Sequence, residues 1–178
     1  MPKPPRRNLV LIGFMGTGKS CIGKLVARSL GWKFVDTDQR IVAAAGCSIP
    51  QIFADPERGE DWFRDLETRV LEETLQGSDQ VVATGGGIVV RERNRQVLAR
   101  GGYVFWLRAS VDALYERVRH NRNRPLLHTD DPKATIAALL DEREPLYLES
   151  AHDQVDSTHL TEEETAFGLT ETARYVFG

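Results

Sequence analysis

The stretch GFMGTGKS, residues 13–20, places three glycines within eight positions, directly after the apolar run Asn8–Ile12. Its Gly-x-x-x-x-Gly-Lys-Ser spacing is that of a Walker A loop, and a helical pattern over residues 20–30 follows it. In such a loop, backbone N–H groups surround phosphate oxygens, the lysine neutralises the β- and γ-phosphates, and the serine hydroxyl binds Mg²⁺. A plain glycine-rich turn with a solvated lysine explains neither spacing nor context. The stretch therefore predicts nucleotide binding.

The composition is typical of a soluble globular chain. Of its 178 residues, 41 % are hydrophobic and 28 % charged, which favours one domain over residues 1–178. The formal net charge of −3 gives no general reason to expect nucleic acid or membrane-surface binding. Cys21 and Cys47 lack metal-ligand spacing and are typical of small apolar packing residues. The basic leader, residues 1–7, is expected to be disordered, and no signal-type segment follows it. We expect a cytoplasmic monomer.

Aliphatic runs alternate with helical periodicity along the chain. Residues 38–77 are expected to be mostly helical, with Gly77 ending the last helix, and further helices are expected at 91–100, at 111–118, from Pro132 and after Thr161. Such alternation implies parallel pairing and right-handed crossovers. The predicted fold is α/β, a three-layer α/β/α P-loop kinase fold with a central parallel sheet, like that of nucleoside-monophosphate kinases. Its other strands are expected at 33–36, 80–84, 103–107 and 154–156.

Two carboxylates, in Asp36-Thr37-Asp38, follow the second expected strand. Ligands bind at the carboxyl ends of strands in open α/β sheets. One carboxylate can serve the magnesium shell, and the other can align an alcohol or remove its proton. A helix N-cap at Asp38 with a turn at Asp36 explains the pair about as well.

Three glycines at residues 85–87 end the next strand at the same edge. They fit either a plain turn or a close backbone approach to a ligand. Arg64 and Arg143 have acidic neighbours, which favours surface ion pairs when each is taken alone. The functional alternative is that the two arginines clamp a small anionic substrate through bidentate bonds.

The cationic segment at residues 119–131 has no helical or strand period and contains Arg124, with Arg117 just before it. In a phosphoryl-transfer protein, such a loop can close over the nucleotide, exclude water and bring an arginine to the transferring phosphate. A solvated connector is the plain alternative. A nucleic-acid patch is disfavoured because the loop has no aromatic residue.

Taken together, the chain resembles the shikimate kinase family from about residue 8 to residue 156. The motifs that carry this resemblance are LIGFMGTGKS, DTD, WFR, ATGGG, RPLL and ERxPLY, in this order. The resemblance implies an ATP-dependent enzyme that uses Mg²⁺ to phosphorylate the 3-hydroxyl of shikimate, a step toward chorismate and the aromatic amino acids.

The resemblance also implies roles for individual residues. Asp38 would orient the attacking hydroxyl, as base or as aligning group, and Lys19 and Arg124 would act with it in catalysis. The metal would be served by Ser20 and Asp36. The remaining implied contacts are to ATP, from Gly16, Thr17, Gly18, Lys19, Ser20, Cys21, Arg117 and Arg124, and to shikimate, from Asp38, Phe63, Arg64, Gly86, Gly87 and Arg143, with Phe53 beside the ring.

The chain departs from the family pattern in three places. Cys21 replaces the usual threonine, residues 55–60 include about two extra positions, and residues 157–160 lack a clear basic contact for the nucleotide. The rival interpretations are a gluconate-type kinase, a nucleoside-monophosphate kinase and a non-catalytic nucleotide switch. The first should lack the FR, GGG and ERxPLY motifs, and a guanine-specific switch needs an NKxD motif, which is absent.

Overall fold

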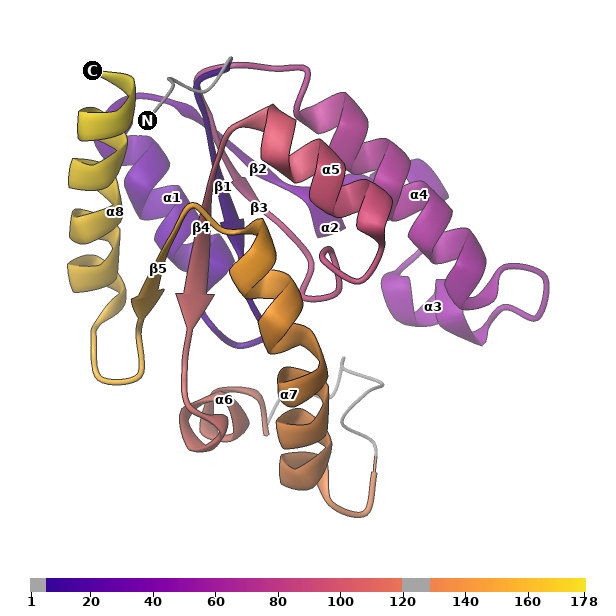
Figure 1. Cartoon of the computed structure of the whole chain (residues 1–178). Coiled ribbons are helices and arrows are strands. Elements are labelled where there is room, and N and C mark those ends of the chain that lie inside the picture. Colours follow the sequence, from indigo (N-terminus) through magenta and orange to yellow (C-terminus); the bar gives the residue numbers. More distant parts are fainter. Residues whose placement is uncertain (1–5, 120–128) are drawn as a thin grey trace.

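A computed structural model describes residues 6–119 and 129–178 (Figure 1). Within these residues one all-parallel sheet has the order β2-β3-β1-β4-β5. The strand positions expected from the sequence are confirmed to within one residue, and the order, which was not predicted, places β1 at the centre. The strands are β1 Asn8–Ile12, β2 Lys33–Asp36, β3 Gln80–Ala83, β4 Tyr103–Arg108 and β5 Asp153–Asp156.

The helices of the described residues connect these strands and end the chain. The helical character of residues 38–77 is confirmed, but α4 ends at Thr74 with Leu75 as its C-cap, so Gly77 does not end the helix as expected. The helices are α1 Lys19–Leu30, α2 Thr37–Ala45, α3 Ile49–Ala54, α4 Gly59–Thr74, α5 Glu92–Gly101, α6 Val111–Val118, α7 Pro132–Ser150 and α8 Glu162–Phe177.

The central strand explains the three layers, because its successive side chains point to opposite faces of the sheet. Leu9 and Leu11 pack in a cluster with α1 and α8. Val10 and Ile12 pack in a second cluster that includes residues of α4, α5 and α7. Figure 1 shows the same separation, with α1 and α8 on one side of the sheet and α4, α5 and α7 on the other. The predicted α/β/α fold is confirmed.

Local capping agrees with the sequence at three helix ends. Gly31 ends α1 in the left-handed conformation, with φ of 67°. The Asp131 side chain accepts a hydrogen bond from the backbone N–H of Ala134 and thereby caps α7. Thr161 and Glu164 form the capping box that opens α8. These caps satisfy backbone groups that helix ends leave without partners inside the helix.

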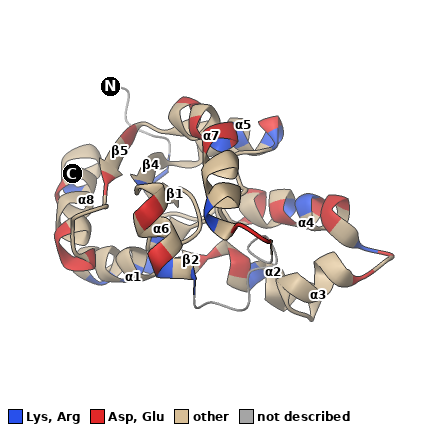
Figure 2. Cartoon of the chain, turned by 90° about the horizontal axis from the view of Figure 1, so that it is seen from below, with Lys and Arg blue, Asp and Glu red and all other residues tan. Residues whose placement is uncertain are grey.

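The sheet places a binding site at the carboxyl end of β1. The connection after β1 runs to the α1 face, whereas the connection from neighbouring β3 runs through α5 on the opposite face. Ligands of open α/β sheets bind where neighbouring connections diverge in this way. Figure 2 looks at this edge and shows basic and acidic segments interspersed along α4 and α5. None of the helices in the described part of the chain is long and apolar enough to span a bilayer.

We predict that His152 makes the folded state less stable below about pH 6.5. Burial lowers the pKa of His152, and its Nδ1 accepts the backbone N–H of Val104 at 3.0 Å, which requires an unprotonated nitrogen. The unfolded chain therefore takes up this proton first as the pH falls. The contribution of His152 to the free energy of unfolding is complete above the pKa that His152 has in the unfolded chain. It is lost as the pH drops toward the lower pKa of His152 in the folded protein.

Urea unfolding at about pH 7.5 and about pH 5.5 measures this effect when the wild type is compared with His152→Gln. The wild type should lose more free energy of unfolding between the two pH values than the variant does. Equal losses in both proteins would contradict the prediction.

Candidate active site

The Walker loop joins β1 to α1 and is shaped by its glycines. At Gly13, whose φ is 141°, an added Cβ would lie 2.3 Å from the carbonyl oxygen of Leu107. Gly18 is the N-cap of α1, with φ of 88°. The Lys19 Nζ, largely buried, donates to the carbonyl oxygens of Gly13 at 2.7 Å and Phe14 at 2.8 Å. The loop thus places a lysine and a helix N-terminus around one concave backbone segment, which suits a phosphate.

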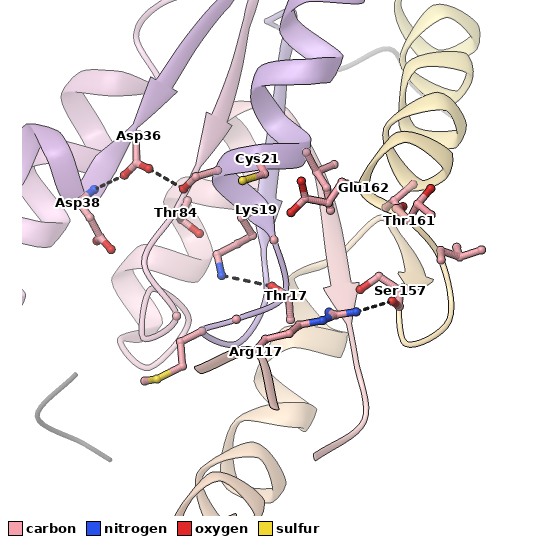
Figure 3. Close-up of a pocket in the computed structure, with 18 residues that line it drawn as sticks. Thr17, Lys19, Cys21, Asp36, Asp38, Thr84, Arg117, Ser157, Thr161 and Glu162 are labelled. Carbon is pink, nitrogen blue, oxygen red and sulfur yellow. Dashed lines mark hydrogen bonds between the residues drawn. The ribbon is translucent and has the colours of Figure 1, made fainter. Parts of the chain in front are cut away.

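A cavity of about 510 Å³ opens from this loop toward β2, α6 and the start of α8 (Figure 3). It brings together every predicted nucleotide and metal residue within the described part of the chain. Of the predicted acceptor residues, it includes Asp38 and Gly86. The cavity is lined by residues 15–22, Asp36, Asp38, Thr84, Gly86, Arg117, Ser157, Leu160, Thr161, Glu162 and Thr165.

Ser20 and Asp36 meet at one side of the cavity. The Ser20 hydroxyl donates to Oδ2 of Asp36 at 2.7 Å (Figure 3). The other oxygen of Asp36 accepts the backbone N–H groups of Asp38 at 3.0 Å and Gln39 at 3.3 Å. Asp36 is therefore the N-cap of α2, so the alternative of a cap at Asp38 with a turn at Asp36 is wrong. Asp38 lies in the first helical turn and projects toward the cavity instead.

Asp38 and a buried carboxylate, Glu67 of α4, both lie against Gly85. A Cβ at Gly85 would stand 2.8 Å from Oδ1 of Asp38 and 3.3 Å from Oε1 of Glu67. Glu67 is 1 % exposed, and burial raises the pKa of its carboxyl, opposed by the guanidinium of Arg64. Sequence reasoning missed Glu67. The signal was its helical spacing from Phe63 and Val70, which places a charge on the buried face of α4.

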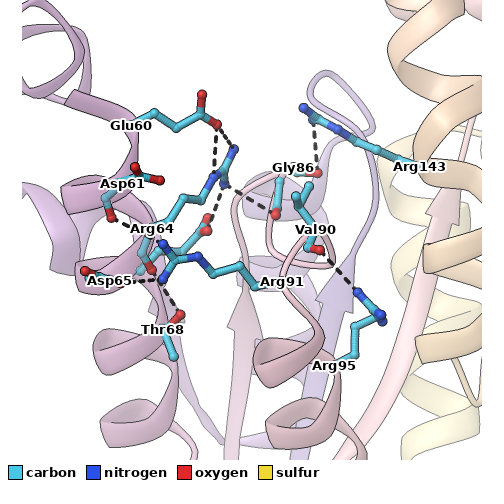
Figure 4. Close-up of polar contacts among 12 residues, drawn as sticks. Glu60, Asp61, Arg64, Asp65, Thr68, Gly86, Val90, Arg91, Arg95 and Arg143 are labelled. Carbon is cyan, nitrogen blue, oxygen red and sulfur yellow. Dashed lines mark hydrogen bonds and ion pairs between the residues drawn. The ribbon is translucent and has the colours of Figure 1, made fainter.

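Arg64 reaches the same glycine segment from α4 (Figure 4). Its Nη1 lies 2.8 Å from Oε2 of Glu67 and 3.4 Å from the carbonyl oxygen of Gly87. Its Nη2 pairs with the exposed Glu60 at 3.2 Å. A Cβ at Gly87 would lie 2.4 Å from Nη1 of Arg64. Arg64 is therefore a mostly buried group beside the cavity, not the surface ion pair of the plain alternative.

Arg143 approaches from α7 on the opposite side of the glycines. The residue is 7 % exposed, and its Nη1 lies 3.5 Å from the carbonyl oxygen of Gly86. The hydroxyl of Tyr147, one turn later, donates to the same oxygen. The buried Nε of Arg143 has no hydrogen-bond partner among the described residues. Such a buried donor calls for an explanation, and an anionic ligand supplies one.

Phe63 and Phe53 lie together beside the acceptor side. Their ring centroids are 4.9 Å apart, and the guanidinium carbon of Arg64 lies 5.2 Å from the centre of the Phe63 ring. Phe63 is buried, whereas Phe53 is 38 % exposed. The pair thus offers one apolar wall near Arg64, and its expected place beside the substrate ring stays a prediction.

The far end of the cavity contains Arg117, which donates through Nη2 to the carbonyl oxygen of Ser157 at 2.9 Å (Figure 3). Cys21 is exposed here, so its predicted role as an apolar packing residue is wrong. Partial desolvation of the sulfur still raises the pKa of its thiol, and the nearby carboxylate of Glu162 raises it further. Glu162 is a second cavity residue that sequence reasoning missed. Acidic residues are common in the first turn of a helix, so its position in α8 gave no signal of a site.

Arg124 and most of the expected lid, residues 119–131, lie outside the described residues. Among the described residues, no three His, Cys, Asp or Glu side chains gather into a metal site. Mg²⁺ in kinases takes only one or two protein oxygens beside substrate phosphates and water. The oxygen pair of Ser20 and Asp36 fits such an ion.

Comparison with known proteins matches one family over most of the chain. The sequence model of the shikimate kinase family matches residues 15–174. A shikimate kinase of Thermodesulfovibrio yellowstonii is 46% identical over 160 residues, covering 90% of this chain and 91% of that protein. One from Rhizobium leguminosarum bv. trifolii is 46% identical over 144 residues, covering 81% and 72%.

The solved structures include a shikimate kinase from Acinetobacter baumannii in complex with shikimate. It superposes with a TM-score of 0.91 at 34% identity, covering 96% of this chain and 94% of that chain. The interpretation drawn from the sequence motifs is thus favoured over a gluconate-type kinase or a non-catalytic switch. The chain belongs to the shikimate kinase family, whose members are ATP-dependent phosphotransferases.

Proposed function

We propose that this protein transfers the γ-phosphate of ATP to the 3-hydroxyl of shikimate. One observation carries the proposal: Asp38, Arg143 and Arg64 contact three successive residues, 85–87, beside the Walker loop. Shikimate is a small carboxylate bearing hydroxyl groups. Two guanidinium groups suit its acid and one carboxylate suits its alcohol, so the arrangement is complementary to this substrate.

The nucleotide side of the proposal rests on the cavity walls. The backbone N–H groups of residues 16–21 would bind the phosphates, and Lys19 would neutralise the charge on the β- and γ-phosphates. Arg117, at the far end, would contact the adenine. Cys21 would lie near the phosphates with its thiol protonated, since its pKa is raised. It therefore adds no negative charge of its own.

Mg²⁺ fits the side of the cavity formed by Ser20 and Asp36. The Ser20 hydroxyl would be a direct ligand, and Asp36 would accept hydrogen bonds from the water shell of the ion. The backbone N–H groups of Asp38 and Gln39 orient the Asp36 carboxylate for this purpose. When bound, the ion neutralises charge on the β- and γ-phosphate oxygens.

On the acceptor side, Arg64 and Arg143 would bind the carboxylate of shikimate, and the backbone of Gly86 and Gly87 would contact its ring substituents. Arg143 supports this because its buried Nε has no partner among the described residues. Arg64 supports it because Glu67 fixes the guanidinium from behind at 2.8 Å. Phe63 and Phe53 would cover one face of the ring.

Asp38 would act on the attacking hydroxyl. Its carboxylate would accept the hydroxyl hydrogen bond, which directs an oxygen lone pair at the γ-phosphorus. As the new O–P bond forms, the bond from phosphorus to the β,γ-bridging oxygen breaks and ADP leaves with that electron pair. The hydroxyl proton passes to Asp38 if it acts as base, or to an oxygen of the transferred phosphate if it only aligns the alcohol. Lys19 and Arg124 would stabilise the charge on the transferring phosphate, Arg124 from outside the described residues.

Three further predictions from the sequence stay predictions: that the chain is one domain, that it is cytoplasmic and that it is a monomer.

A coupled ADP-release assay with shikimate, gluconate and AMP in parallel tests this proposal. We expect turnover with shikimate and none with gluconate or AMP. Turnover with gluconate or AMP, but not with shikimate, would overturn the assignment of the acceptor. Nucleotide binding without turnover on any of the three would favour a non-catalytic switch.

We predict that Arg64→Ala and Arg143→Ala each raise the KM for shikimate by about 10- to 100-fold, because each removes charge-assisted hydrogen bonds to the carboxylate. The Kd for ATP should change little, since neither side chain lines the nucleotide cavity. Steady-state kinetics and ATP titration measure the two effects. Arg69→Ala, which removes an exposed arginine of α4, is the matched control. Equal weakening of ATP and shikimate binding would contradict the clamp.

We also predict that Lys19→Ala lowers kcat by about a thousandfold or more, because the transferring phosphate loses its positioned charge. Thermal unfolding should show that the variant still folds. The measurement is kcat at saturating ATP and shikimate. A kcat near that of the wild type would rule out the role assigned to Lys19.

A further inference from the structure

The loop at residues 85–90, between β3 and α5, is held through its carbonyl oxygens. Arg64 of α4 reaches the oxygen of Gly87 at 3.4 Å, and Arg143 of α7 reaches that of Gly86 at 3.5 Å. These distances are long for hydrogen bonds. Both arginines belong to the proposed acceptor site, so these contacts can give way when a carboxylate arrives. Figure 4 shows the two side chains on opposite sides of the glycine segment. Other contacts therefore hold the loop, among them the Tyr147 hydroxyl on the oxygen of Gly86 and the packing of Ile88 and Val89 in the core.

Arg95 of α5 supplies stronger contacts to the same loop. Its Nη1 donates to the carbonyl oxygens of Val89 at 2.9 Å and Val90 at 3.2 Å. Its side chain is only 18% exposed, and it is not among the residues that line the nucleotide cavity. Arg95 therefore holds the loop from outside the nucleotide cavity, and Figure 4 shows its contact with Val90.

Arg95 also lies near the helix that carries Arg143, although its Nε makes no hydrogen bond among the described residues. Its Nε lies 3.5 Å from Oε2 of Glu149, on α7. Tyr147, on the same helix, donates to the carbonyl oxygen of Gly86. The loop is thus hydrogen-bonded to α7 through Tyr147 and, beyond residues 87 and 88, to α5 through Arg95.

We propose that Arg95 is a positioning residue of the acceptor site, fixing residues 85–90 so that Gly86 and Gly87 present their backbone between Arg64 and Arg143. The inference rests on the proposed function, because it assigns the acceptor to this place. The Arg95 side chain suits the role because its Nη1 donates to two successive carbonyl oxygens, those of Val89 and Val90. A lysine ends one atom short of Nη1, so its ammonium reaches these two oxygens less well.

The test is Arg95→Met, which keeps an unbranched side chain and removes the guanidinium group. The KM for shikimate should rise about tenfold, because a small misplacement of binding groups weakens substrate contacts strongly. The KM for ATP should rise by no more than about twofold, because Gly86 is the only one of residues 85–90 that lines the nucleotide cavity. Arg93→Met is the matched control. Arg93 lies on the same helix with its side chain 70% exposed and pairs only with Glu72 in the described structure.

The split between the two KM values separates positioning from a general structural role. If Arg95→Met raises both KM values equally, or leaves the KM for shikimate unchanged, the proposal is overturned. Arg95→Lys keeps the charge and covers the case in which Arg95→Met fails to fold. It should show a smaller, still selective rise in the KM for shikimate, and an unchanged value would also overturn the proposal.

Failure of the proposed function is recognised separately, in the wild type. A wild-type protein that does not phosphorylate shikimate refutes the assigned acceptor, whatever the variants do. A wild type that turns over normally, together with an Arg95→Met variant of normal shikimate KM, refutes only the positioning role.

Discussion

Three consecutive positions without side chains, residues 85–87, are the steric condition on which the site depends. A Cβ would stand 2.8 Å from Asp38 at Gly85 and 2.4 Å from Arg64 at Gly87. Both distances are shorter than atoms tolerate, so a larger residue would push the carboxylate or the guanidinium away. The glycines expected to approach a ligand thus first make room for the protein's own charged groups, which all lie against the same short backbone segment.

The fold was largely predictable because its signals are local. The Walker spacing, the aliphatic runs and the capping residues at Gly31, Asp131 and Thr161 depend on neighbours in the sequence, and the structure confirms them. Strand order was not predictable, since it depends on which faces the helices cover. The cap at Asp36 was missed for a related reason. Asp36 and Asp38 can both cap a helix. The composition of the segment and its hydrophobic spacing are the same whichever of the two is the cap.

The residues of the candidate site were predictable where they stand in motifs. They were not predictable where their role is to hold another site residue in place. Asp38, Arg64 and Arg143 stand in recognisable motifs, and their roles stay predictions. Glu67 and Arg95 stand in ordinary charged helices, and only the fold reveals that each holds part of the site. For Glu67, the helical face was a usable signal. For Arg95, the contacts are to backbone carbonyls, which no sequence pattern displays.

The lysine of the Walker loop has a consequence for the thermodynamics of nucleotide binding. Its ammonium already lies 2.7 Å from the oxygen of Gly13 and 2.8 Å from that of Phe14, removed from bulk water. Much of the loss of water and of rotamer freedom that a phosphate would otherwise impose has therefore occurred during folding. Arrival of the triphosphate exchanges neutral partners for anionic ones, so the ordering penalty at this residue is small and the gain is chiefly coulombic.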